Sequence, residues 1–220
     1  MATHIIIIGA GQFGREIHQY IEDVKQTRDV DWQIKGFLDS NLKALDGYNI
    51  GPDILGTVEE HSVDPTARYV CAMGDARLRN KIFDHFKNQD AALLTLIHPT
   101  AYVAPSASIG EGAILAPFSF VSVNAVIGKN VALNTYASCG HDAVVGQSAV
   151  LSPYAVINGC VRLENEVFMG THSTVIPRKT VGAHSKIAAG AVVMKDIPKM
   201  SIAYGNPAVV GPLLPPRTQD

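Results

Sequence analysis

Aliphatic residues recur at every sixth position from residue 97 to residue 193, and this repeat constrains the fold more than any other feature. Only Cys139 and Met169 replace an aliphatic side chain in the series, and both types are readily buried. A second series, four residues later, is small or β-branched, as at Ala137 and Ala155. Neither a helix nor a single strand has this period, whereas a solenoid of short strands stacks such residues from coil to coil. We therefore predict a hexapeptide-repeat β-solenoid over residues 97–198.

An α/β pattern precedes the repeat. A β-branched run at residues 5–8 ends in Gly9-x-Gly11-x-x-Gly14, after which apolar residues follow at helical spacing from Ile17 to Val24. Further strands are expected at 33–38, 68–73 and 92–96, and a helix is expected across 75–87.

Charge density marks the boundary between these two patterns. Residues 1–96 contain 24 of the 38 charged residues, and residues 97–198 contain 11. The predicted organisation is an α/β domain over 1–96, a solenoid over 97–198 and a C-terminal cap or tail over 199–220.

Composition argues against several partners. The formal net charge is −2 without a basic stripe, so neither nucleic acid nor an anionic membrane is an expected partner. No apolar stretch has the length of a membrane span, and the N-terminus lacks a signal-peptide pattern, so a cytoplasmic location is expected. Cys71, Cys139 and Cys160 show neither a disulfide framework nor paired metal-ligand spacing, and no metal is expected.

The glycine turn follows a strand and opens a helix, which is the context in which such a motif binds a diphosphate. A plain tight turn between strand and helix is the alternative. Asp39 stands where an acidic residue can accept hydrogen bonds from a ribose or a base, although it also fits an ordinary turn before Ser40. Fewer than a hundred residues are present before the repeat, so a nucleotide diphosphate is a more suitable ligand than NAD.

The segments Leu133-Asn134-Thr135 and Gly140-His141-Asp142 complete a specific resemblance. A glycine-turn domain followed by a solenoid with these segments resembles the nucleotide-sugar N-acetyltransferases of 4-amino-4,6-dideoxy sugars, above all their GDP-perosamine branch. The resemblance implies a small Rossmann-like α/β domain followed by a left-handed parallel β-helix. It also implies acetyl-CoA as co-substrate, a nucleotide-linked amino sugar as acceptor, and a homotrimer with active sites between subunits.

His141 and Asp142 are the predicted catalytic residues. His141 lies two places after the inward Cys139, so its side chain is expected to point outward from a coil corner. Asp142 is suited to orient the imidazole. His141 then acts either as the general base for the sugar amine or only as a positioning group. A third alternative, an acyl-enzyme on Cys139, conflicts with the inward position of that residue.

The remaining predicted contacts follow the resemblance. The predicted substrate contacts are Gly9, Gly11, Gln12, Phe13, Gly14, Asp39, Ser40, Gly74, Arg79 and Asn134. The predicted acetyl-CoA contacts are Gly159, Gly170, Thr171, Ala188, Ala189 and Lys195. Arg79 has a charged helix surface as its alternative role, and Lys195 fits a solvated surface lysine better than a phosphate contact.

Two further functions fit the same pattern. One is a sugar O-acetyltransferase of the sialic-acid type, and the other is a non-catalytic solenoid that binds a nucleotide sugar. A metal-dependent enzyme of the γ-carbonic-anhydrase type requires three converging histidines, which the spacing of His141, His172 and His184 does not provide. His98, His172 and His184 are expected at the surface or in subunit contacts.

Overall fold

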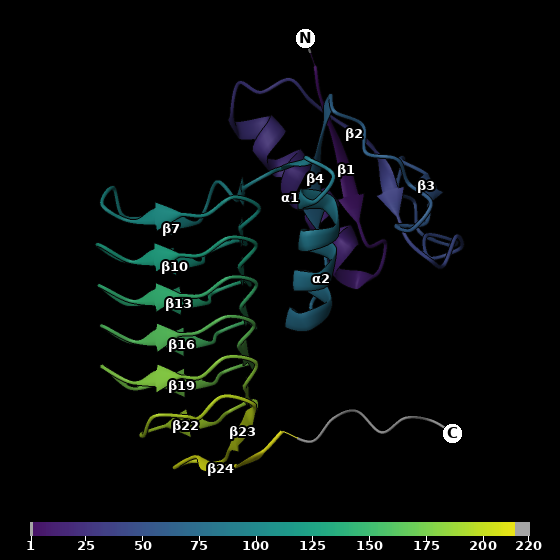
Figure 1. The fold of residues 1–220 in the computed structure, drawn as a ribbon. Coiled ribbons are helices and arrows are strands. Elements are labelled where there is room, and N and C mark those ends of the chain that lie inside the picture. The colour runs from purple at the N-terminus through teal and green to yellow at the C-terminus, as the bar shows by residue number, and fades with distance from the viewer. Residues whose placement is uncertain (1, 214–220) are drawn as a thin grey trace, which may run out of the picture.

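The structure is a computed structural model that describes residues 2–213. A small α/β domain lies beside the upper coils of a long parallel solenoid (Figure 1). The predicted fold class, an α/β domain followed by a left-handed parallel β-helix, is confirmed. Residues 214–220 of the predicted tail lie outside the described part of the chain.

The α/β domain is built on a five-stranded parallel sheet with the order β3-β2-β1-β4-β5. Its strands are β1 (Thr3–Ile8), β2 (Trp32–Leu38), β3 (Ile54–Gly56), β4 (Ala67–Cys71) and β5 (Ala92–Leu93). Its helices are α1 (Gln12–Thr27) and α2 (Ala76–Lys87). The strands predicted at 33–38 and 68–73 are confirmed, and the short β3 was not anticipated from the sequence.

The strand predicted at 92–96 is divided between the two parts of the molecule. Residues 92–93 form β5 at the edge of the first sheet, whereas Leu96 already begins the solenoid. The helix predicted across 75–87 is confirmed, with Asp75 as its N-cap. The Asp75 side chain accepts hydrogen bonds from the backbone N–H groups of Arg77 and Leu78, which otherwise lack partners at a helix start.

The solenoid consists of two-residue strands separated by four-residue connections. These strands are β6 (Leu96–Ile97), β7 (Tyr102–Val103), β8 (Ser108–Ile109), β9 (Ile114–Leu115), β10 (Phe120–Val121), β11 (Val126–Ile127), β12 (Ala132–Leu133), β13 (Ser138–Cys139), β14 (Val144–Val145), β15 (Val150–Leu151), β16 (Val156–Ile157), β17 (Arg162–Leu163), β18 (Phe168–Met169), β19 (Thr174–Val175), β20 (Thr180–Val181), β21 (Lys186–Ile187) and β22 (Val192–Val193). An antiparallel pair, β23 (Ser201–Tyr204) and β24 (Val209–Pro212), follows the last coil.

Successive strands belong to three different sheets, so each strand pairs with the strand one coil away. Leu133 pairs with Leu151, for example, and Cys139 pairs with Ile157. The second residue of each strand points inward, and from Leu115 to Val193 these residues are buried in one continuous core. This confirms the predicted ladder, which no single coil could bury alone.

The three connections of each coil form three corners of the solenoid. We call them the first corner (connections such as 134–137), the second corner (140–143) and the third corner (146–149). A residue with positive φ recurs every six positions at these corners, for example Asn124 at 57°, Asn130 at 55° and Asp142 at 57°. Asparagine and aspartate tolerate this left-handed conformation better than most residues, which favours them at such turns.

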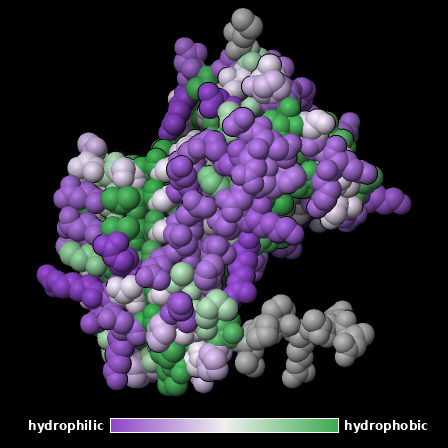
Figure 2. Space-filling model, in the orientation of Figure 1, coloured by the Kyte–Doolittle hydropathy of each residue, from purple (hydrophilic) through white to green (hydrophobic). Residues whose placement is uncertain are grey.

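The α/β domain covers one of the three sheets. Ile114, Ala132 and Val150 face outward from that sheet, yet they are buried because the helices pack on them. The chemical character of the surface differs between the two parts, with mainly hydrophilic residues over the α/β domain and columns of hydrophobic residues along the solenoid (Figure 2). Neither of the two described helices has the length and hydropathy of a membrane span.

Candidate active site

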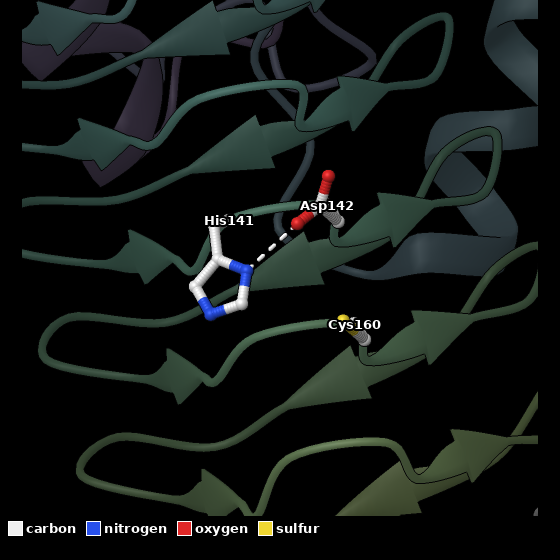
Figure 3. Close-up of side chains that lie close together, drawn as sticks. All are labelled: His141, Asp142 and Cys160. Carbon is white, nitrogen blue, oxygen red and sulfur yellow. Dashed lines mark hydrogen bonds and ion pairs between the residues drawn. The ribbon is translucent and has the colours of Figure 1, made fainter.

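His141 and Asp142 lie together at the second corner, on the connection between β13 and β14 (Figure 3). Nδ1 of His141 is 2.8 Å from Oδ2 of Asp142, and the side chains are 59% and 48% exposed. An ionised carboxylate accepts hydrogen bonds only, so Nδ1 carries a proton, and in the neutral imidazole Nε2 is then the nitrogen with the lone pair. The predicted outward orientation of His141 is confirmed, and the pair is arranged as a base with its orienting carboxylate.

Asn124, one coil earlier at the same corner, supports the carboxylate. Its Nδ2 donates to Oδ1 of Asp142 at 3.1 Å, so both carboxylate oxygens are engaged. The hydrogen bond from His141, followed by that from Asn124, lowers the pKa of the Asp142 carboxyl below its ordinary value. Asp142 therefore stays charged at neutral pH and holds the imidazole in one tautomer.

Gly159 lies one coil after His141 and leaves the space that the imidazole occupies. A Cβ on Gly159 would lie 2.3 Å from Nε2 and 2.5 Å from Cε1 of His141. The sequence predicted Gly159 as a coenzyme contact. The structure shows a different local requirement, because any side chain here displaces the ring.

Two cysteines near this corner differ completely in environment. Cys139 is fully buried in the core, and burial raises the pKa of its thiol far above the ordinary value. Its position rules out the acyl-enzyme alternative, since neither a thiolate nor an acyl donor has access. Cys160 is exposed, and its sulfur belongs to a cluster with His141 and Asp142. Sequence reasoning gave Cys160 no role, although its spacing of eighteen residues from Asp142 predicts the stacking.

A pocket of about 280 Å³ lies between the glycine turn and the first corner of the solenoid. It brings together Gln12, Phe13, Gly74 and Asn134, four of the predicted substrate contacts. Nδ2 of Asn134 donates to the carbonyl of Leu151, which fixes the amide against the next coil. Residues far apart in the sequence thus meet where the α/β domain touches the solenoid.

The three glycines of the turn serve different purposes. Gly9 has φ of +103°, and a Cβ on Gly14 would lie 1.9 Å from the carbonyl oxygen of Gly9, so the turn cannot close with a side chain there. Gly11 caps α1 without a side-chain hydrogen bond and has open space around it. The first N–H groups of α1 therefore remain available at the positive end of the helix, as a diphosphate requires.

Asp39 and Ser40 line a second pocket of about 250 Å³, at the ends of β2 and β4. Oδ2 of Asp39 accepts the backbone N–H of Ala10 at 2.8 Å, and Oδ1 accepts that of Asn41 at 2.9 Å. Asp39 thus ties the end of β2 to the glycine turn, and each carboxylate oxygen retains a lone pair for a ligand.

Arg79 requires a correction, because the structure places it away from both pockets. The residue is fully buried under the solenoid side of α2. Its guanidinium donates to the backbone carbonyls of four residues in β4, the following loop and the solenoid, namely Cys71, Met73, Gly112 and Asn130. These bonds occupy the donors that a diphosphate would need, so Arg79 joins the two domains instead of contacting the substrate.

Of the three other histidines predicted at the surface or in subunit contacts, one is buried. His98 is 7% exposed, with Nε2 3.1 Å from Asp23 of α1 and Nδ1 2.8 Å from Oγ1 of Thr100. His184 lies 3.2 Å from a carboxylate oxygen of Glu166. His172 is exposed and stacks on Tyr154 with ring centroids 4.7 Å apart. His172 and His184 therefore lie at the surface as predicted, and the prediction is wrong for His98, which is buried against α1.

The predicted acetyl-CoA contacts occupy two corners. The first corner carries Gly170, Thr171, Ala188 and Ala189, and the second corner carries Gly159 and the exposed Lys195. A Cβ on Gly170 would lie 2.6 Å from the backbone nitrogen of Ala189, so this glycine is also required for coil stacking. The sheet of β13, β16, β19 and β22 lies between the two corners.

Comparisons with known proteins show relatives over the α/β domain and over nearly the whole chain. Residues 4–86 match the family of PglD N-terminal domains. The chain superposes on the acetyltransferase domain of PglB from Neisseria gonorrhoeae with a TM-score of 0.85 and 30% identity, over 94% of this chain and 98% of that chain. PerB from Caulobacter crescentus, in complex with CoA and GDP-perosamine, gives a TM-score of 0.81 and 28% identity over 96% of this chain and 98% of its own.

Curated sequences match over shorter segments. The UDP-N-acetylbacillosamine N-acetyltransferase of Bacillus subtilis is 31% identical over 115 residues, 51% of this chain and 50% of that protein. Matches to Staphylococcus aureus relatives span 26% of the length of those proteins. The fold and the exposed histidine–aspartate pair define an acyltransferase of the hexapeptide-repeat class. Within that class, the chain belongs to the same family as the acetyltransferase domain of PglB, with an N-terminal part of the PglD type.

Proposed function

We propose that this protein transfers an acetyl group from acetyl-CoA to the amine of a nucleotide-linked 4-amino-4,6-dideoxy sugar, with GDP-perosamine as the expected acceptor. The observation that carries the proposal is the exposed imidazole of His141. Its Nδ1 is held by Asp142, and Nε2 is free to accept a proton.

Direct transfer follows from this arrangement. The sugar amine attacks the thioester carbonyl, and Nε2 of His141 takes the amine proton as the new carbon–nitrogen bond forms. The carbon–sulfur bond then breaks, and the imidazolium returns the proton to the departing CoA thiolate. No acyl-enzyme is needed, because a thioester is already activated and a positioned amine reacts with it directly.

The nucleotide sugar is proposed to bind along the glycine turn. The base and ribose fit the pocket beside Asp39 and Ser40, and the diphosphate fits the N-terminus of α1 at Gly11. The sugar then extends toward Gln12 and Asn134 in the adjoining pocket. Acetyl-CoA is proposed to bind along the first and second corners of the C-terminal coils.

The proposed assembly is a homotrimer with active sites between subunits. Within one chain, the glycine-turn pocket adjoins the first corner, whereas His141 lies at the second corner across the sheet of β13 and β16. A neighbouring subunit that presents its second corner to this pocket would bring His141 to the sugar. A site completed by a second copy therefore agrees with the separation of these residues.

Relatives support the proposed reactants. The PglB domain has also been solved with acetyl-CoA, at 29% identity to this chain. Histidine variants of the Caulobacter enzyme, one to asparagine and one to alanine, were likewise solved with CoA and GDP-perosamine. The Bacillus relative is named for a UDP-linked sugar, so the nucleotide has to be identified by experiment.

The test is acetyl transfer to GDP-, UDP- and dTDP-linked 4-amino-4,6-dideoxy sugars, comparing wild type with His141→Ala. We expect turnover with one amino sugar and a loss of about 10²- to 10⁴-fold in kcat/KM for the variant, the usual contribution of a general base. His85→Ala on the exposed face of α2 is the control and should retain full activity.

Other outcomes are equally informative. A loss of less than about tenfold in His141→Ala would make His141 a positioning group, since proton transfer by a base contributes more than this. Acetylation of hydroxyl acceptors with no turnover of any amino sugar would contradict N-acetylation. Binding of a nucleotide sugar without transfer to any acceptor would contradict the enzyme itself.

A further inference from the structure

His141, Asp142 and Cys160 form a cluster with the composition of a soft divalent metal site. One imidazole nitrogen, one carboxylate oxygen and the Cys160 sulfur all lie within 4.8 Å of one another. Figure 3 shows the three side chains on two neighbouring coils, at one corner of the solenoid. Imidazole nitrogen, thiolate sulfur and carboxylate oxygen are the three ligand types that zinc uses in proteins.

The backbone holds these side chains in fixed relative positions. The N–H of Cys160 donates to the carbonyl of His141 at 2.8 Å, so adjacent coils are joined where the ligands project. Asp142 and Cys160 have φ of 57° and 60°, and they stack at the same position of successive coils. Gly159 leaves the imidazole room beside Cys160. A rigid scaffold of this kind reduces the entropy lost when a metal gathers its ligands.

We propose that this cluster binds Zn²⁺ through His141, Asp142 and Cys160 and that the bound ion inhibits acetyl transfer. Ligand atoms around a tetrahedral zinc lie about 3.5 Å apart, given bonds of about 2.0 to 2.3 Å. All three side chains are exposed, so small rotations can close the cluster around an ion. The fourth position stays open for water.

Inhibition follows because the ion would bind His141, which the proposed reaction uses as its base. In this respect the inference rests on the proposed function. Whichever imidazole nitrogen binds the ion, the other nitrogen carries the ring proton, so no lone pair is left to accept the amine proton. Binding replaces the thiol proton of Cys160 with the metal, and that proton is released to solvent.

Cys160 distinguishes this site from an ordinary exposed histidine–carboxylate pair. Thiolate is a soft ligand that favours zinc over magnesium and calcium. The other two cysteines, Cys71 and Cys139, are buried and have no access to an added ion. Any metal–thiolate signal from the protein therefore reports on Cys160.

The first measurement uses Co²⁺ as a spectroscopic substitute for zinc, on chelator-treated full-length protein. We expect a near-ultraviolet thiolate-to-cobalt charge-transfer band in wild type that disappears in Cys160→Ser and in Cys160→Ala. Added Zn²⁺ should displace the cobalt and abolish the band. Absence of the band in wild type, or its persistence in both variants, would overturn the site.

The second measurement is inhibition of acetyl transfer by Zn²⁺, followed by chromatography of the acetylated sugar because the thiol of free CoA also binds zinc. Without zinc, Cys160→Ser should transfer the acetyl group at the wild-type rate. We expect the variant to need at least about tenfold more Zn²⁺ for half-inhibition, the usual scale for loss of a metal-site group. Equal inhibition of both proteins would overturn the proposal.

The two measurements separate this inference from the proposed function. A cobalt band in a protein that acetylates no amino sugar would contradict the proposed function and leave the metal site established. An active protein with no band would contradict the metal site alone.

Discussion

Asn124 and Asn130 occupy successive corners of one coil, share nearly the same backbone conformation, and have opposite surroundings. Asn124 has φ of 57°, is exposed, and donates to Asp142 beside His141. Asn130 has φ of 55°, is fully buried beneath α2, and donates to the carbonyl of Arg79 and to Oγ of Ser148. The same residue at equivalent repeat positions thus supports a reactive histidine at one corner and a domain interface at the other.

The repeat determines whether a side chain points inward or outward. The packing of the α/β domain then determines what an outward side chain contacts. At the second corner nothing in the described chain covers His141 and Asp142, so both side chains remain in contact with solvent. At the third corner, α2 removes Asn130 and Ser148 from water, and Arg79 and Asn80 supply their partners. Buried polar groups are nearly always hydrogen-bonded, and at this corner their hydrogen bonds join the α/β domain to the solenoid.

The largest predicted effect on stability comes from removing the guanidinium of the buried corner. Arg79→Met should lower the free energy of unfolding by about 3 kcal/mol or more, because several buried carbonyls lose their donors. Urea unfolding measures this change. Arg77→Met on the exposed side of the same helix is the control, with an expected change within about 0.5 kcal/mol.

The two arginine variants can also contradict the comparison. Equal stability of Arg79→Met and Arg77→Met would mean that the buried corner does not hold the domains together. A large rise in KM at unchanged stability would return Arg79 to the substrate site.

The next effect concerns the exposed corner. Gly159→Ala places a methyl group where Nε2 of His141 lies, so we expect the ring to shift and kcat/KM to fall by about 100-fold, with little change in Tm. Gly51→Ala is the matched control, because a Cβ there meets nothing within 4 Å. Unchanged activity of Gly159→Ala would show that the position of His141 in this structure is not the reactive one.

The smallest effect tests the two asparagines directly. Asn124→Ala and Asn130→Ala both place alanine in the left-handed region, at a shared cost of about 1 to 2 kcal/mol. Asn130→Ala should cost about 1 kcal/mol more, because the buried Arg79 carbonyl and Ser148 each lose a partner. The Oδ1 atom of Asn130 has no protein partner among the described residues, which keeps this difference small.

Chemical denaturation of both asparagine variants, side by side, gives the difference. Equal destabilisation would remove the distinction between the two corners. Asn124→Ala should in addition weaken acetyl transfer, since it loosens the carboxylate that orients His141, whereas Asn130→Ala should leave it near the wild-type rate.

Much of the fold follows from local patterns. The six-residue series gave the solenoid, its inward ladder and the outward direction of His141, because the period of a repeat fixes which way each side chain points. The glycine turn and Asp75 gave the starts of both helices. The short β3 escaped prediction, since three residues are too few to show a strand period.

The site was predicted less completely, and its misses share one cause. Arg79 was predicted as a substrate contact or part of a charged helix surface, and His98 as a surface or subunit-contact residue, because the sequence does not show which distant elements cover them. Their partners, Asn130 and Asp23, are 51 and 75 residues away. Cys160 was missed as a neighbour of His141 because the two adjoin only when one coil stacks on the next.

The repeat, the inward or outward direction of its side chains and the glycine turn can all be predicted from the sequence, because they depend on periodicity and local backbone sterics. Which corner is covered and which stays open can be seen only in the folded chain. That choice depends on where α1 and α2 dock on the solenoid, through contacts such as those of Arg79 and Asn130 between residues distant in the chain. Burial depends on the sum of such contacts, so it is a property of the assembled fold and not of any segment.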